Sequence, residues 1–194
     1  GQEDEDSKQA TETFIKSLYE HCEEALGRYI GSPTLEGTHE EKQAVRALFA
    51  VGELSMIGFR NDEESIPGRR KRRRTPMDPL EAISVKPAAR LLSIVETLLA
   101  TTLPHEIETQ PRKTPHRVRA HAFLTLGKLC IRDPVLAKNS LVLFSRELQR
   151  REEASPTVLS NVLLTMGDLC ARYTNLVDIY LPTVAAFFLS WVVE

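Results

Sequence analysis

The chain has 194 residues, of which 42% are hydrophobic and 27% are charged, and its formal net charge is −2. This composition allows a sizeable buried core in a single elongated domain and excludes a chain that is disordered throughout. The charge is uneven, with 6 basic and 15 acidic residues in 1–68, 18 and 7 in 69–151, and 1 and 5 in 152–194.

The N-terminal third is predicted to form two helices. Apolar side chains recur on one face of residues 8–29, and a Gly-Ser-Pro turn at 31–33 ends this first helix. The second helix is predicted to run from Thr38, which forms a capping box with Glu41, to about residue 58.

A polar segment of about residues 61–86 follows, and we interpret it as a flexible basic insertion. Residues 87–101 carry apolar side chains at helical spacing and are predicted to form the next helix. Residues 103–113 are interpreted as a linker.

Three dipeptides place a capping side chain before a proline and so predict further helix starts: Thr114-Pro115, Asp133-Pro134 and Ser155-Pro156. Residues 176–193 are apolar, but Asp178 and Pro182 interrupt them, and the uninterrupted part is too short to span a membrane. We expect a last helix here whose partner is missing.

An internal repeat dominates the C-terminal half. Residues 118–130 read VRAHAFLTLGKLC, and residues 158–170, about forty positions later, read VLSNVLLTMGDLC. Residues 50–54 are a third copy of the central part, displaced from the next copy by the insertion. A period near forty residues is typical of HEAT and armadillo repeats, whose helix pairs stack because no pair covers its own apolar face.

The repeat predicts an all-α fold, an α-solenoid of HEAT/armadillo-type helical repeats with a basic loop insertion. We expect one solenoid segment over residues 1–194, with its best-defined repeats at 115–150 and 155–190.

No catalytic or metal-binding motif is found in the sequence. The histidines have no ligand spacing, and HExxH, GxSxG and a phosphate-binding glycine loop are absent. His121 is expected to be a hydrogen-bonded residue between helices. Cys22, Cys130 and Cys170 are expected to pack as free thiols in a reducing compartment. We therefore predict no enzyme, no cofactor, no metal and no small-molecule substrate.

The beginning of the chain is acidic and lacks a starting Met. A secretory signal would be basic and then apolar, so none is predicted there. The missing Met suggests a fragment.

A run of six cations in the insertion is a candidate nuclear localisation signal: Arg69, Arg70, Lys71, Arg72, Arg73 and Arg74. Like charges repel, so the run must be exposed. It could instead contact nucleic-acid phosphates or only keep the loop soluble.

A second, scattered basic group supplies candidate DNA-binding residues: Arg112, Lys113, Arg117, Arg119, Lys128 and Arg132. These cations form either ordinary solvated helix faces or a basic ridge on a DNA backbone. No aromatic residues interleave with the group, which favours duplex phosphates over stacking on single strands.

Thr114 begins the sequence Thr-Pro-His-Arg, the pattern preferred by cyclin-dependent kinases, and is a candidate phosphorylation site. Phosphate there would add about two negative charges within the most basic stretch. A capping role for the same hydroxyl is an equal alternative, and the two are compatible because a helix N-terminus also accommodates phosphate.

Two long strings bring a family into view. RAHAFLTLGKLCIRDPVLAKNSLVLFSREL and NVLLTMGDLCARYTNLVDIYLP resemble the HEAT-repeat D-type subunit of condensin, and the condensin II version more closely than that of condensin I. The clear resemblance covers residues 118–182. Beyond Pro182 the chain departs from the family, whose members continue with many more repeats.

The resemblance implies a non-catalytic scaffold. D-type subunits bind the kleisin subunit and contact double-stranded DNA, and the complex compacts mitotic chromosomes in the nucleus without any membrane role. ATP hydrolysis belongs to other subunits. Two alternatives stay open at this point: a protein-binding solenoid, such as an adaptor or nuclear transport factor, without DNA contact, and a regulatory subunit of an enzyme.

Overall fold

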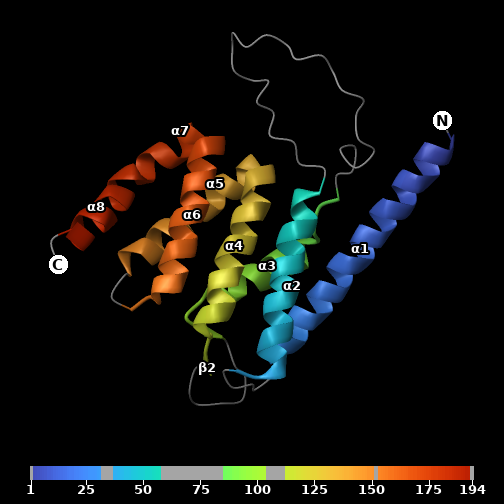
Figure 1. Cartoon of the computed structure of the whole chain (residues 1–194), viewed down its shortest axis with the longest axis horizontal. Coiled ribbons are helices and arrows are strands. Elements are labelled where there is room, and N and C mark those ends of the chain that lie inside the picture. The colour runs from blue at the N-terminus through green and yellow to red at the C-terminus, as the bar shows by residue number, and fades with distance from the viewer. Residues whose placement is uncertain (1, 32–36, 58–84, 104–111, 151–152, 193–194) are drawn as a thin grey trace, which may run out of the picture.

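The computed structural model describes residues 2–31, 37–57, 85–103, 112–150 and 153–192 (Figure 1). The helices are α1 (Gln2–Gly31), α2 (His39–Met56), α3 (Ala89–Thr97), α4 (His116–Arg132), α5 (Pro134–Gln149), α6 (Pro156–Arg172), α7 (Thr174–Val177) and α8 (Leu181–Val192), with a 3-10 turn η3 (Asp178–Tyr180). Within these ranges, strand structure is confined to an antiparallel pair, β1 (Thr102–Leu103) and β2 (Arg112–Lys113). The predicted all-α solenoid is confirmed.

Helices α2, α4 and α6 run parallel, side by side, in one layer (Figure 1). The Thr125 hydroxyl donates to the Leu48 carbonyl 77 positions earlier, at 2.8 Å. In the next step of the stack, the Asn161 amide donates to the Ala120 carbonyl 41 positions earlier, at 3.1 Å. These separations are close to the offsets between sequence copies, which are 75 residues from α2 to α4 and 40 residues from α4 to α6. Equivalent repeat positions therefore lie next to each other on neighbouring helices.

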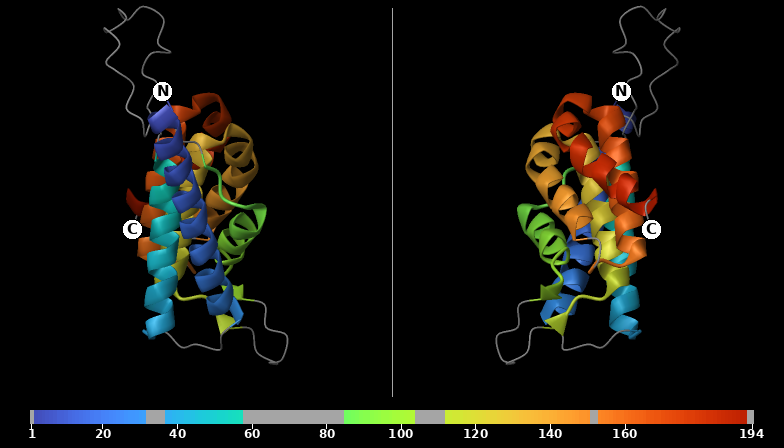
Figure 2. Two further views of the ribbon diagram at one scale, coloured as in Figure 1. Left: turned by 90° about the vertical axis from the view of Figure 1, so that its right-hand side faces the viewer. Right: turned by 90° about the vertical axis from the view of Figure 1, so that its left-hand side faces the viewer.

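Helices α3 and α5 form a second layer behind the first (Figure 2), and α8 packs against α5. The core lies between the layers, where the Phe123 and Phe144 rings pack at 5.7 Å between centroids. Both rings are almost completely buried, as are Leu48 and Leu126. Helix α1 covers the N-terminal flank of α2, and its buried side chains recur at helical spacing from Ile15 to Tyr29.

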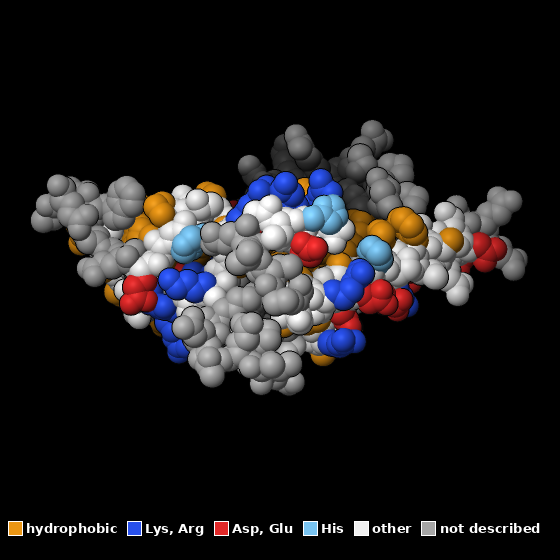
Figure 3. Space-filling model, turned by 90° about the horizontal axis from the view of Figure 1, so that it is seen from below, with side chains coloured by type: hydrophobic (Ala, Val, Ile, Leu, Met, Phe, Trp, Pro, Cys, Tyr) orange, Lys and Arg blue, Asp and Glu red, His pale blue; other side chains and the backbone are white. Residues whose placement is uncertain are grey.

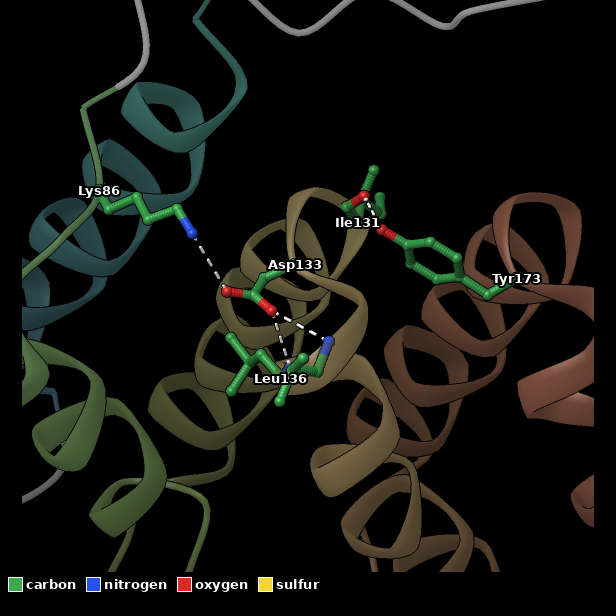
Figure 4. A network of polar contacts seen from close by, with 6 residues as sticks. Lys86, Ile131, Asp133, Leu136 and Tyr173 are labelled. Atoms are coloured by element: carbon green, nitrogen blue, oxygen red, sulfur yellow. Dashed lines mark hydrogen bonds and ion pairs between the residues drawn. The ribbon is translucent and has the colours of Figure 1, made fainter. Parts of the chain in front are cut away.

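Two predicted helix caps are confirmed. The Thr38 hydroxyl accepts from the Glu41 amide at 3.3 Å, although the Glu41 carboxylate accepts from Gly37 and not from Thr38 itself. Gly37 takes a left-handed backbone conformation, with φ of 82°, in this turn. Asp133 accepts from the amides of Val135 and Leu136, both at 3.0 Å, and Lys86 lies beside the same carboxylate (Figure 4).

The predicted start of α4 is wrong by one residue. Pro115, and not Thr114, occupies the capping position, and no side chain caps this helix. Ser155 does occupy the capping position of α6, before Pro156, but its hydroxyl makes no capping bond. A proline can begin a helix without such a bond because its fixed φ suits the first turn.

Most of the predicted insertion at 61–86, with the run Arg69 to Arg74, lies outside the described residues. In the described part of the chain, no helix is long and apolar enough to cross a membrane. No cluster of His, Cys, Asp and Glu there could hold a metal ion. Cys22, Cys130 and Cys170 are free thiols, and burial raises the pKa of Cys130 to about 12.

Candidate nucleic-acid interface

The parallel stack converts the sequence repeat into rows of side chains that cross from helix to helix. Adding the repeat offsets aligns Lys42 with Arg117, and Arg46 with His121. Lys42, Arg46 and Arg117 are exposed, and His121 is partly exposed. We call these four residues the basic face. Figure 3, seen from the end at which α2 and α4 begin, shows lysine and arginine side chains gathered along the upper edge, over these helices.

Three cations of this face are available for a ligand. Lys42, Arg46 and Arg117 form no ion pair with any residue that the structure describes. Lys128, one turn beyond Leu124 and two turns beyond His121 on α4, is different, because its ammonium group pairs with Glu53 and lies 5.6 Å from the Phe49 ring centroid.

His121 reports the local positive potential. Burial lowers the pKa of its imidazole below the usual 6.5, and the nearby charges of Arg117 and Lys128 lower the pKa further. The prediction that His121 forms a hydrogen bond between helices is wrong, since it makes none with the described residues. The ring instead lies on a partly exposed surface whose charge already repels cations.

This environment predicts a pH effect on stability. A histidine whose pKa is lower in the folded state contributes its full stability above the unfolded pKa, near 6.5, and that stability is lost as pH falls from there through the lower pKa of the folded state. We expect the free energy of unfolding to fall between pH 7 and pH 5, and to fall less in His121→Asn. Urea unfolding at both pH values measures this, with His116→Asn, exposed at the start of α4, as the control.

The six predicted DNA-binding residues do not form one surface. Lys113 on β2 and Arg117 on α4 are exposed, and Arg112 belongs to β2. Arg132 is bound to its own protein, since its guanidinium donates to the carbonyls of Ser55, at 2.9 Å, and Ile57, at 2.6 Å, at the end of α2.

The prediction for Arg119 is corrected by its burial. Its side chain is 2% exposed and its guanidinium donates to the Glu147 carboxylate at 2.8 Å and to the Leu99 carbonyl at 2.9 Å. This bond set joins α4 to α5 and to the end of α3. Arg119 therefore holds the two layers together and does not face a ligand.

Thr114 is also buried, with 4% of its surface exposed, and its hydroxyl has no hydrogen-bond partner among the described residues. The backbone at Thr114 is held as well, because its amide donates to the Thr101 carbonyl at 2.8 Å. A kinase would have to open this segment before it could reach the hydroxyl.

Sequence reasoning missed Lys42 and Arg46. Both belong to the strongly acidic segment 1–68, so a count of charges along the chain hides them. Extending the repeat alignment upstream would have found them, since Lys42 falls on the position of Arg117 and Arg46 on that of His121.

Comparison with known proteins supplies independent information. A family described as condensin-2 complex subunit D3-like HEAT repeats matches residues 85–148. The mouse condensin-2 complex subunit D3 is 31% identical in an alignment 181 residues long, which covers 84% of this chain and 10% of that protein. The Xenopus laevis condensin-2 complex subunit D3-L is 34% identical in an alignment 113 residues long, which covers 50% of this chain and 7% of that protein.

A plant relative shows the same likeness. The condensin-2 complex subunit CAP-D3 of Arabidopsis thaliana is 30% identical over 89 residues, covering 46% of this chain and 6% of that protein. The chain thus spans at most 10% of the length of these curated relatives. No solved structure matches it.

Proposed function

The chain belongs to the condensin-2 D3-like HEAT-repeat family, and on that premise we propose that it is a non-catalytic scaffold segment that contacts double-stranded DNA through its basic face. The observation that carries this proposal is the set of exposed cations at equivalent positions of α2 and α4, which form no ion pair with the described residues. In the cell, such a segment would act in the nucleus, on mitotic chromosomes, within a condensin complex that contains a kleisin.

Phosphate contact suits the chemistry of this face. Lys42, Arg46 and Arg117 are on rigid helices, and Lys113 is exposed on β2, directly before α4. Long cationic side chains bind phosphates by releasing counterions and need no fixed base-reading geometry. We therefore infer binding that is independent of DNA sequence and weakens steeply with salt.

The test is the affinity for a short DNA duplex over a salt series. We expect Lys42→Glu combined with Arg117→Glu to reduce the slope of log affinity against log salt by about 2, because each lost phosphate contact removes about 1. The matched control is Lys138→Glu combined with Arg146→Glu on α5, which changes the same charge at exposed positions of the other layer.

A third variant replaces Arg69 to Arg74 by Gly and Ser. If the slope survives this replacement, DNA contact belongs to the helices. Loss of the slope with this run, or an equal loss in the α5 control, would contradict a basic face on α2 and α4.

A protein-binding solenoid without DNA contact is the second candidate. It is favoured by one specific observation: a row of exposed apolar side chains borders the basic face, and DNA phosphates do not require such a row.

A further inference from the structure

Equivalent positions of the three parallel helices carry large apolar side chains that face solvent. Phe49 on α2 is 57% exposed and Leu164 on α6 is 64% exposed, and Leu124 on α4 lies between them, partly exposed. The repeat offsets align these three residues one turn beyond Arg46 and His121. We call Phe49, Leu124 and Leu164 the apolar row.

Stacking of the helices does not cover this row. Helix α2 has a neighbour on each side, α1 and α4, and Phe49 is still exposed. The positions that face a neighbouring helix are others: a methyl group built on Gly52 would lie 3.0 Å from Cδ of the Lys128 side chain, and one built on Gly127 would lie against Thr165. A further repeat added beyond α6 would therefore cover the side of Gly167 and leave Leu164 facing outward.

The rows on either side of the apolar row differ in charge. On one side lie Arg46 and His121, with Lys42 and Arg117 a turn further along. On the other side, Lys128 is already paired with Glu53, and the equivalent position on α6 is the exposed acid Asp168. One border is thus positive and has no ion-pair partner in the described part of the chain, whereas the opposite border is close to neutral or acidic.

We propose that the apolar row is a docking site for an amphipathic protein helix that lies across α2, α4 and α6 with acidic residues on one flank. Neighbouring packed helices are about 8–10 Å apart, so the row presents one apolar side chain at each such step. A helix rises about 1.5 Å per residue, and apolar residues seven positions apart are separated by about 10.5 Å. A leucine at every seventh position would meet Phe49, Leu124 and Leu164 in turn.

Charge complementarity fixes the orientation of the bound helix. Its acidic flank lies over Arg46 and Arg117, and its opposite flank, over Glu53 and Asp168, carries neutral or basic residues. The site can be tested separately from the proposed DNA contact, since its affinity also depends on apolar side chains that phosphates do not use. Because both ligands need the same cations, peptide and duplex DNA compete.

The probe is a fluorescein-labelled helical peptide with leucine at every seventh residue, glutamate on one flank and glutamine on the other. Fluorescence anisotropy with the full chain measures its affinity. We expect Phe49→Ser combined with Leu164→Ser to weaken binding at least tenfold. The matched control, Phe14→Ser combined with Val135→Ser, removes a phenylalanine that is 62% exposed and a valine that is 68% exposed on α1 and α5, and should leave affinity unchanged.

Two further peptides test the site without changing the protein. Lysine in place of glutamate should abolish binding at low salt, and serine in place of leucine should weaken it at least tenfold. Equal binding of the lysine peptide would overturn the charged flank, and equal loss in both protein variants would overturn the apolar row.

Two other occupants are distinguished in the same experiments. If the row variant weakens duplex DNA binding as much as it weakens peptide binding, the whole face is a nucleic-acid surface and the helix site is overturned. If sedimentation shows that the chain self-associates and Phe49→Ser with Leu164→Ser makes it monomeric, the occupant is a second copy. Retained DNA binding with lost peptide binding supports the site.

Discussion

Replacing Glu147 by alanine is expected to lower the free energy of unfolding by about 3–5 kcal/mol, because it leaves the guanidinium of Arg119 charged and buried without its partner. The two side chains are 2% and 6% exposed, so water cannot replace the lost carboxylate. Of the acceptors that the structure describes, the Leu99 carbonyl alone would still accept from Arg119. Urea unfolding followed by circular dichroism measures the loss.

A second variant shows whether the destabilisation by Glu147→Ala comes from the buried unpaired charge or from lost packing. Arg119→Met combined with Glu147→Leu removes both charges and keeps apolar volume, and replacing a buried pair in this way is often neutral or stabilising. We expect the double variant to be at least as stable as the unmodified chain. If Glu147→Ala costs less than about 1 kcal/mol, as exposed ion pairs do, then the pair is not buried in solution.

The Arg119 result explains why charge counting is a poor guide to this site. In the sequence, Arg119 is one of several cations around a helix start, and its spacing from Arg117 does not distinguish it from a surface residue. Residues two positions apart on an α-helix are separated by about 200° around its axis, so Arg117 and Arg119 lie on opposite faces. The spacing does not tell which of the two faces inward. The partner that makes burial tolerable, Glu147, is 28 positions away and on another helix, where local patterns cannot find it.

The fold was predictable from the sequence for a physical reason. Stacked repeats contact their neighbours with the same register at each step, so an offset read from the sequence becomes a contact between helices. The bond between Tyr173 and the Ile131 carbonyl, 42 positions apart and 2.6 Å long, illustrates this for the last step of the stack (Figure 4). Local geometry was less predictable: α1 begins earlier than expected, at Gln2, and α3 ends earlier, at Thr97.

The positions of the repeat are of two kinds: some face a neighbouring helix and others face solvent. Positions that face a neighbouring helix stay small or form bonds across the stack, as Gly127 and Thr125 do. Positions that face solvent change chemistry from one copy to the next, so that Lys42, Arg117 and Thr157 occupy equivalent places. Constraint by packing thus applies to the first kind, and the second kind is where binding chemistry can differ along the stack.

The glycines of the repeat test this division. Replacement by alanine is expected to lower the free energy of unfolding at Gly127 and to raise it at Gly167. A methyl group on Gly127 would lie 2.3 Å from Cγ2 and 2.9 Å from Oγ1 of Thr165, so α4 and α6 would have to separate or Thr165 would have to rotate. Overpacking of this kind costs about 1–3 kcal/mol, more than the gain of about 1 kcal/mol in helix propensity. We expect Gly127→Ala to be destabilising.

The equivalent glycine of the next copy has nothing within 4 Å of the same built methyl group and is exposed. Gly167→Ala should therefore raise the free energy of unfolding by about 0.5–1 kcal/mol, since only the helix propensity changes. Thr165→Ala introduced into Gly127→Ala should recover part of the loss, and thermal unfolding of the four proteins measures each step. Stabilisation by Gly127→Ala would mean that α4 and α6 are not in close contact, and the row alignment that places Phe49, Leu124 and Leu164 together would fail with it.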